Sequence, residues 1–174
     1  MAGLNISKVK FLVVEDNPFM KELFRQILRT LGVTQIVEAS DGAEGLVLLR
    51  EMSPDIVLLD WQMEPMDGIA FAKQVRAKNS PTPYIPIIMV TAYSEIVRVT
   101  EARDAGINEL LVKPIAATSL FSRIRAVIER PRLFVEAGTY FGPDRRRRND
   151  PNRKGEDRRK VDDKSLALVG ETAA

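Results

Sequence analysis

Four short apolar runs, each ending at a polar or charged residue, constrain the fold of this chain more than any other feature. The runs are Lys10–Val14, Asp55–Leu59, Ile85–Val90 and Leu110–Val112, and a weaker one, Gln35–Glu38, lies between the first two. Runs this apolar are typical of strands in a parallel sheet, because helices cover both of its faces. The sequence therefore predicts five short strands in one parallel sheet.

Amphipathic segments with recognisable ends separate these runs. The expected helices span residues 19–31, 42–52, 69–78, 95–105 and 118–129, and the first four are preceded by the capping residues Asn17, Asp41, Asp67 and Ser94. Side chains of these types accept hydrogen bonds from the free N–H groups of a first helical turn. Strands that alternate with helices of this length form right-handed βαβ units. We therefore predict an α/β fold with a doubly wound five-stranded parallel sheet.

Functional-looking residues follow the apolar runs at their C-terminal ends. They are Glu15, Asp16, Asp60, Thr91 and Lys113. In doubly wound sheets the site lies beyond these strand ends. Carboxylates can hold Mg²⁺, and a carboxylate can attack a phosphoryl group once nearby cations neutralise the charge. A lone acid after a strand is commonly a helix cap or a solvated loop residue. That interpretation does not account for five polar or charged residues at the ends of four strands.

These residues belong to strings that resemble the signature of bacterial response-regulator receiver domains of the CheY type. The strings are Glu15-Asp16, Asp60-Trp61-Gln62-Met63-Glu64-Pro65-Met66-Asp67-Gly68, Thr91-Ala92 and Lys113-Pro114. The resemblance covers residues 8–130 and implies a flavodoxin-like receiver fold. It also implies a cis peptide bond between Lys113 and Pro114, which is accessible at modest cost only before proline.

The resemblance implies a role for each residue of the acidic pocket. Asp60 would accept a phosphoryl group from a histidine kinase or phosphotransfer protein. Mg²⁺ would be held by Glu15, Asp16, Asp60 and the backbone carbonyl of Gln62, while Thr91 and Lys113 would contact the phosphoryl group. The family usually has an aromatic residue three positions before the lysine, where this chain has Leu110. We therefore expect phosphorylation to remain feasible without necessarily being the main switch.

Composition limits the other functions of the chain. Its 174 residues contain neither cysteine nor histidine, which excludes disulfides, thiolate metal sites and histidine-based acid–base chemistry. No apolar run approaches the ~20 residues of a membrane span, and the first residues lack the apolar core of a signal peptide. Residues 131–174 offer no second enzymatic or DNA-binding domain. We expect a cytoplasmic signalling protein that is not an enzyme.

The C-terminal extension, residues 131–174, has a different charge balance. Residues 1–137 hold 16 Lys+Arg and 17 Asp+Glu, a net −1, whereas residues 138–174 hold 10 and 7, a net +3. Between Arg145 and Arg159 there are eight basic residues, seven of them arginine, and three acids. Few aliphatic residues occur there, so we expect the extension to be largely disordered and to order on ligand binding. Guanidinium groups bind phosphate or guanine edges bidentately and stack on flat rings.

The extension resembles the arginine-rich segment of the Cle proteins, the CheY-like cyclic-di-GMP effectors of alphaproteobacteria. The resemblance covers residues 139–160 and implies binding of cyclic di-GMP, in the form of a stacked dimer. It also implies a role in tuning the flagellar motor, through its switch or a motor-associated protein, with recruitment to the flagellated pole. The expected nucleotide contacts are Tyr140, Phe141, Asp144, Arg145, Arg146, Arg147, Arg148, Asp150, Arg153, Asp157, Arg158 and Arg159.

Two other interpretations of the extension stay open. The chain could be a single-domain phosphorelay regulator that acts through its receiver surface and whose extension is incidental. Alternatively, the extension could be an RNA-binding arm, in which case binding would weaken steeply with salt through counterion release. Small-ligand binding through stacking and bidentate contacts would depend less on salt and would saturate at a fixed stoichiometry.

Overall fold

A five-stranded parallel sheet forms the centre of the molecule. The structure is a computed structural model and describes residues 4–92, 96–145 and 160–162. The strands are β1 (Lys10–Val14), β2 (Gln35–Ala39), β3 (Ile56–Asp60), β4 (Ile87–Thr91) and β5 (Glu109–Val112), in the order β2-β1-β3-β4-β5. All neighbouring pairs are parallel. The predicted fold class is confirmed, including the weak second strand.

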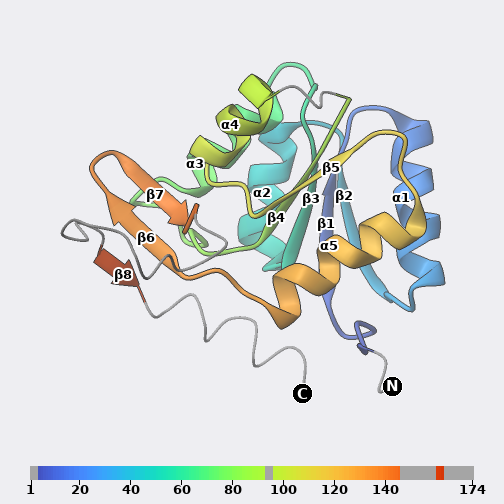
Figure 1. Cartoon of the computed structure of the whole chain (residues 1–174). Helices are drawn as coiled ribbons and strands as arrows, with labels where there is room; N and C mark the ends of the chain where they lie inside the picture. The colour runs from blue at the N-terminus through green and yellow to red at the C-terminus, as the bar shows by residue number, and fades with distance from the viewer. Residues whose placement is uncertain (1–3, 93–95, 146–159, 163–174) are drawn as a thin grey trace.

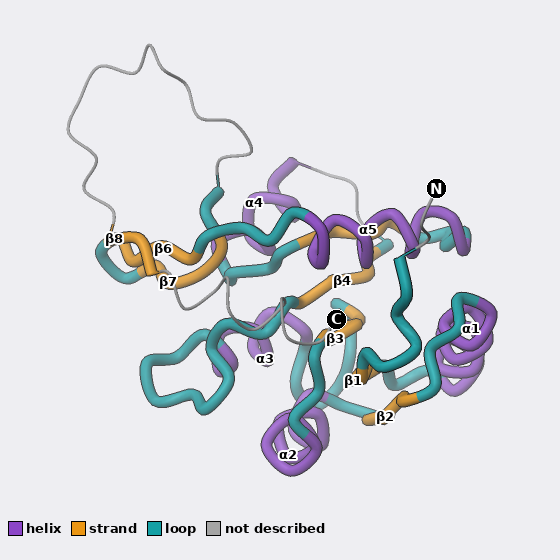
Figure 2. Tube along the Cα trace, turned by 90° about the horizontal axis from the view of Figure 1, so that it is seen from below, coloured by secondary structure: helices purple, strands orange, loops and turns teal. Residues whose placement is uncertain are grey.

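Helices cover both faces of this sheet (Figures 1 and 2). They are α1 (Pro18–Thr30), α2 (Gly42–Met52), α3 (Gly68–Val75), α4 (Ile96–Asp104) and α5 (Ala117–Glu129). The buried residues of α1 and α5 share one apolar cluster with one face of the sheet, and those of α2, α3 and α4 share the other. Within the described residues, no helix is long and apolar enough to cross a membrane.

Three of the predicted helix caps are present. The side chain of Asn17 accepts hydrogen bonds from the first turn of α1, Asp41 does so for α2, and Asp67 does so for α3. The side chain of Glu44, in the first turn of α2, also accepts a 2.6 Å hydrogen bond from the backbone N–H of Ser40. Ser94, the proposed cap of α4, lies outside the described residues.

Helix α3 ends three residues earlier than predicted, at Val75 rather than at residue 78. Arg76 is the C-cap residue, and its guanidinium lies inside the protein instead of on a helix surface. It donates hydrogen bonds to the carbonyls of Gly106 (3.0 Å) and Pro83 (2.7 Å). A third bond, 3.0 Å long, reaches the Oδ1 atom of Asn108.

A second, smaller sheet follows α5 and was not predicted from the sequence. Strands β6 (Phe134–Ala137) and β7 (Tyr140–Pro143) form an antiparallel hairpin, and β8 (Lys160–Asp162) pairs antiparallel with the other edge of β6. The hairpin lies beside the sheet at the α3 and α4 side (Figure 1). Ordered structure therefore continues past residue 130, the predicted end of the folded domain. Few aliphatic residues occur in this part of the chain, and aromatic side chains supply the buried apolar area that the hairpin needs to fold.

Candidate functional site

The predicted pocket residues lie together at one edge of the parallel sheet. Asp60 ends β3 and Thr91 ends β4, while Glu15 follows β1 and Lys113 follows β5. Parallel pairing brings the C-terminal ends of these strands to the same edge. The N–H of Lys113 also donates a 2.8 Å hydrogen bond to the carbonyl of Thr91. The structure thus brings four residues from four strand ends into one site.

Asp60 is held by two interactions at the bottom of this site. One carboxylate oxygen, Oδ1, lies 2.6 Å from the ammonium nitrogen of Lys113. The other, Oδ2, accepts a 2.8 Å hydrogen bond from the backbone N–H of Gln62. The side chain is only 5% exposed. A buried carboxylate with a neighbouring cation is suited to accept a group that carries negative charge.

Glu15 is the most unusual group in the site. Its Oε1 atom accepts a 3.2 Å hydrogen bond from the N–H of Asn17, but its buried Oε2 atom has no hydrogen-bond partner. The nearest cation, the Lys113 ammonium, lies 3.8 Å from that oxygen. Burial and, to a lesser extent, repulsion by Asp60 raise the pKa of Glu15 to about 7, although Lys113 acts in the opposite direction. An unsatisfied buried oxygen of this kind is a ready position for a cation.

The donor set fits Mg²⁺ better than a metal that needs an all-protein cage. No group of three or more carboxylate, histidine or cysteine side chains in the described part of the chain is arranged to hold a metal by itself. Mg²⁺ commonly takes only one or two carboxylates and completes its octahedron with water and phosphate oxygens. Glu15 and Asp60 offer buried carboxylates, and the exposed Asp16 stands at the rim.

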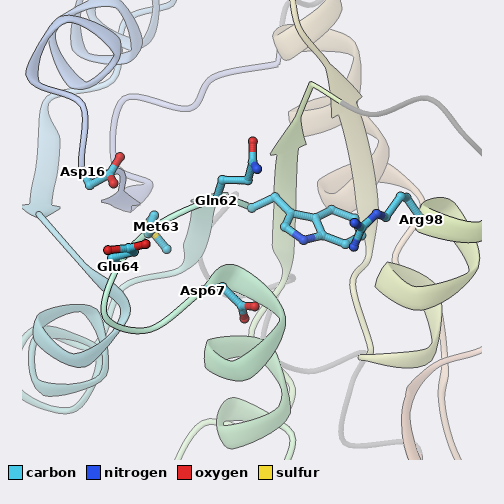
Figure 3. Close-up of a pocket in the computed structure, with 7 residues that line it drawn as sticks. Asp16, Gln62, Met63, Glu64, Asp67 and Arg98 are labelled. Carbon is cyan, nitrogen blue, oxygen red and sulfur yellow. The ribbon is translucent and has the colours of Figure 1, made fainter.

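A pocket of about 570 Å³ adjoins these residues, and Asp16 and Trp61, which directly follow Glu15 and Asp60 in the chain, line it. Its lining comes from Asp16, from the loop between β3 and α3, and from α4. Figure 3 shows Asp16, Met63 and Glu64 on one side of the pocket and Arg98 of α4 on the other. The guanidinium carbon of Arg98 lies 5.7 Å from the centre of the Trp61 ring, a cation–π contact. The pocket is large enough for a phosphoryl group with its metal and water.

The switch residues show one agreement and one departure from the resemblance. The Lys113–Pro114 peptide bond is cis, as expected, and a second cis bond precedes Pro65, which was not predicted. Thr91 is buried at the end of β4. Leu110 is partly buried and packs against the apolar cluster on the α2–α4 side of the sheet. An aliphatic side chain in this position has no hydroxyl or ring to exchange between inner and outer positions.

Four of the predicted nucleotide contacts lie in the described part of the chain, on or next to β7. They are Tyr140, Phe141, Asp144 and Arg145. The remaining eight, Arg146, Arg147, Arg148, Asp150, Arg153, Asp157, Arg158 and Arg159, lie outside the described residues. The guanidinium carbon of Arg145 is 4.0 Å from the centre of the Tyr140 ring, so the two groups are stacked. The Tyr140 hydroxyl donates a 2.7 Å hydrogen bond to the carbonyl of Pro143, which fixes the ring.

The hairpin is attached to the receiver by an aromatic cluster that was not identified from the sequence. The ring of Tyr84 lies 5.3 Å from that of Phe134 and 5.5 Å from that of Phe141. The buried guanidinium of Arg76 lies 5.0 Å from the Phe134 ring. Phe141, predicted as a ligand contact, therefore packs against the receiver. The available signal was the presence of three aromatic residues, Phe134, Tyr140 and Phe141, in a segment with few other apolar residues.

Arg76 is the polar centre of this attachment. Burial lowers its pKa to about 9, so the guanidinium remains protonated at neutral pH. Its cation is compensated by two carbonyl oxygens, the amide oxygen of Asn108 and the face of the Phe134 ring. The same Asn108 oxygen accepts a 2.9 Å hydrogen bond from the N–H of Ile87 at the start of β4. The hairpin therefore sits at the N-terminal end of β4, opposite the acidic pocket.

Comparison with known proteins places this geometry in a family. Residues 11–125 match the response regulator receiver domain. Chemotaxis protein CheY-3 of Vibrio cholerae serotype O1 is 34% identical over 130 residues, which cover 75% of this chain and 99% of the relative. Chemotaxis protein CheY of Pseudomonas aeruginosa is 36% identical over 122 residues, covering 70% and 98%. Both matches cover nearly the whole relative and only part of this chain.

Solved structures show the same fold. A putative response regulator from Chloroflexus aurantiacus has a TM-score of 0.66 at 29% identity, with 70% of this chain and 98% of that chain covered. Vibrio cholerae CheY4 has a TM-score of 0.64 at 28% identity, covering 68% and 98%. The CheX–CheY–BeF3–Mg²⁺ complex from Borrelia burgdorferi has a TM-score of 0.61 at 28% identity, covering 68% and 88%.

Proposed function

This chain belongs to the response regulator receiver family, and from that premise we propose that it is a chemotaxis signalling adaptor phosphorylated on Asp60. The observation that carries the proposal is the pairing of the buried Asp60 carboxylate with Lys113 at 2.6 Å, beside the unsatisfied oxygen of Glu15. The adaptor performs no catalytic turnover on a small substrate. It passes its signal on by contact with other proteins.

In the transfer step, a carboxylate oxygen of Asp60 attacks the phosphorus of a phosphohistidine on the donor, a histidine kinase or phosphotransfer protein. The new O–P bond forms as the P–N bond breaks, and the histidine nitrogen leaves with its electron pair. Lys113 then pairs with a phosphoryl oxygen, and the Thr91 hydroxyl donates a hydrogen bond to another. These contacts offset the negative charge that accumulates in the pocket.

Glu15, Asp16, Asp60 and the backbone carbonyl of Gln62 would hold Mg²⁺. When bound, the ion would neutralise charge on the phosphoryl oxygens. The buried Oε2 atom of Glu15 supports this assignment, because it has no hydrogen-bond partner and its ion pair with Lys113 is long, at 3.8 Å.

The test is incorporation of phosphate from a small phosphodonor such as acetyl phosphate in the presence of Mg²⁺. We expect one acid-stable, base-labile phosphoryl group per chain, absent in Asp60→Asn. Asp67→Asn is the matched control, because Asp67 lines the pocket that adjoins Asp60 and its amide replacement can still cap α3. Phosphate incorporation by Asp60→Asn at the wild-type level would refute the assignment.

We also propose that the arginine-rich segment binds cyclic di-GMP, as a stacked dimer. Support comes from its composition, with eight basic residues between Arg145 and Arg159, and from the stacked pair of Arg145 and Tyr140 at its start. The segment is also anchored at both ends. Strand β7 before it and β8 after it both pair with β6, so the strands that flank the arginine-rich segment are held by the same partner strand.

This anchoring lowers the entropy cost of binding. Ordering about 15 residues opposes binding by about 15–30 kcal/mol of backbone entropy, and each charge-assisted hydrogen bond returns about 1.5–3 kcal/mol. Bringing together the ends of a segment of this length costs about 2 kcal/mol of chain entropy. Because β7 and β8 are already paired with β6 before the ligand binds, this cost does not oppose binding. Many arginine and stacking contacts must still act together, which favours a ligand dimer with several phosphates and rings.

Calorimetric titration of cyclic di-GMP into the full chain tests this proposal. Truncation after residue 130 would remove the buried Phe134, so a better variant replaces residues 146–159 by a Gly–Ser linker and keeps all three strands. We expect saturable binding to the wild type and none to the linker variant. Unchanged binding to the linker variant would refute the assignment.

A second variant, with lysine in place of the four arginines at positions 145–148, separates nucleotide recognition from attraction to any polyanion. Lysine keeps the charge and loses the bidentate and stacking geometry. Cyclic di-GMP binding should fall, whereas non-specific RNA retention should stay the same and weaken with salt. If the lysine variant loses cyclic di-GMP binding and RNA binding to the same extent, or keeps both, the result would favour the RNA-binding alternative.

We propose the flagellar motor switch, or a protein associated with the motor, as the target of the adaptor. Exposed apolar side chains on α4 and β5 supply a surface for it: Val97 is 76% exposed, Val99 40% and Val112 39%. Val97→Lys should weaken target binding in calorimetry. Val47→Lys is the control, since Val47 is 48% exposed on α2, away from this surface. Equal effects of the two variants would exclude the surface.

A further inference from the structure

Helix α4 connects the acidic pocket to the arginine-rich segment. Near its start, Arg98 lines the pocket and contacts the Trp61 ring. At its last residue, the Oδ1 atom of Asp104 lies 3.2 Å from a terminal nitrogen of Arg145. Six residues separate Arg98 from Asp104, which corresponds to about 9 Å along a helix. One short element therefore touches both of the sites proposed above.

The Asp104–Arg145 ion pair competes with a ligand for the same guanidinium. Arg145 is the first arginine of the segment, and its side chain already stacks on Tyr140. Its side chain is 38% exposed and that of Asp104 is 48% exposed. An ion pair this exposed is weak and can open and reform easily. A phosphate or guanine edge that takes up Arg145 would displace the Asp104 carboxylate.

The two sides of this ion pair differ in how firmly they are held. On the hairpin side, Phe134 and Val135 are buried, and Phe134 packs on Arg76. Gly142 of β7 lies so close to Gly106 that an added Cβ atom would be 3.0 Å from the Gly106 Cα. On the helix side, Ala102 is the single buried side chain among the described residues 97–104 of α4. The first turns of α4, which include Arg98, are therefore packed less firmly than the hairpin beside the end of the helix.

We propose that the Asp104–Arg145 contact couples the two sites through α4, so that a phosphoryl group on Asp60 and cyclic di-GMP at the arginine-rich segment favour each other's binding. The inference rests on the proposed functions of both sites. A phosphoryl group on Asp60 attracts the Arg98 guanidinium toward the pocket and shifts α4, which draws Asp104 away from Arg145. The ligand removes the same contact from the other side. Since both events oppose one contact, each lowers the work required for the other.

The first measurement requires no nucleotide. BeF3⁻ with Mg²⁺ serves as the phosphoryl analogue, and backbone amide resonances of the full chain are followed by NMR. Shifts at Thr91 and Lys113 would show that the pocket is loaded. We expect the amides of Tyr140 and Arg145, at the opposite end of the sheet, to shift as well. In Asp104→Asn the pocket should load as before and the distant shifts should disappear.

The control variant is Glu136→Gln, because it removes a negative charge from the hairpin itself without touching Arg145. The Glu136 side chain is 45% exposed, and its Oε1 atom lies 3.4 Å from the ammonium nitrogen of Lys78. This variant should keep the distant shifts. Distant shifts that persist unchanged in Asp104→Asn would overturn the coupling, as would a loaded pocket that leaves Tyr140 and Arg145 unaffected. Failure of the wild type to bind BeF3⁻ would overturn the Asp60 proposal and the coupling with it.

The reciprocal measurement is calorimetry of cyclic di-GMP with and without BeF3⁻ and Mg²⁺. An exposed ion pair limits the coupling, so we expect about a two- to fivefold tighter binding in the loaded wild type. Asp104→Asn should bind cyclic di-GMP more tightly than the wild type without BeF3⁻, by a similar factor. Adding BeF3⁻ should not increase its affinity further. If the wild type binds no cyclic di-GMP while the distant NMR shifts occur, the ligand assignment fails and the α4 link stands. Binding that is tight but insensitive to BeF3⁻ refutes the link alone.

Discussion

The titration of Glu15 should make the stability of the metal-free protein depend on pH. The folded protein holds the pKa of this carboxyl at about 7, compared with its usual value of 4.5. The folded state therefore binds a proton at Glu15 more tightly than the unfolded chain does. Between pH 4.5 and 7 the free energy of unfolding falls as pH rises, and the contribution of the protonated group is lost above pH 7.

The size of the effect follows from the difference between the two pKa values. At 1.36 kcal/mol per pH unit, it amounts to about 3 kcal/mol. The physical source is the charge of the Glu15 carboxylate. One of its oxygens is buried without a hydrogen-bond partner, and the Asp60 carboxylate lies close by. Mg²⁺ at this position would compensate the charge and remove most of the loss.

Urea unfolding at several pH values between 4.5 and 8, with EDTA or with Mg²⁺, measures this effect. Other groups also titrate, so the informative quantity is the difference between the wild type and Glu15→Gln. That difference should grow with pH by about 3 kcal/mol in EDTA, in favour of the variant, and shrink in Mg²⁺. Parallel stability curves for the two proteins in EDTA would show that Glu15 is not a strained buried acid. An equal difference with and without Mg²⁺ would remove it from the metal site.

The other predictions concern the attachment of the hairpin and the charge in the pocket. Phe134→Ala should destabilise the protein by about 3–4 kcal/mol in urea unfolding, because the ring is buried against Arg76, whereas Leu133→Ala, at an exposed position, should change stability by less than about 1 kcal/mol. Arg76→Lys should cost about 2–4 kcal/mol in the same assay, since an ammonium group cannot reproduce the planar set of three hydrogen bonds; a loss below about 1 kcal/mol would contradict that role. Lys113→Met should weaken BeF3⁻ binding about 10- to 100-fold in a fluorescence titration, because one charge-assisted hydrogen bond is lost, and unchanged affinity would contradict the assignment of Lys113 as the phosphoryl partner.

Local patterns in the sequence were sufficient to predict the receiver fold. Continuous apolar runs such as Lys10–Val14 can be buried only between two layers of helices, and side chains such as Asn17 fix where the helices begin. Strand-end residues could be assigned to one site because parallel strands all point the same way, which places Asp60 and Lys113 at a common edge. These inferences depend on periodicity and chain direction, and both are readable from the sequence.

Contacts between distant segments were decided by the tertiary structure. The burial of Arg76 just after α3 depends on its hydrogen bonds to Gly106 and Pro83, and the attachment of the hairpin depends on Phe134 meeting Tyr84 across fifty residues of chain. No local period signals such contacts, because an aromatic residue in a polar segment is equally compatible with solvent. The sequence alone identified the acidic pocket and the arginine-rich segment as two separate features. Their connection through α4 became visible only when folding placed Asp104 beside Arg145, since an ion pair between distant residues requires the backbone that brings them together.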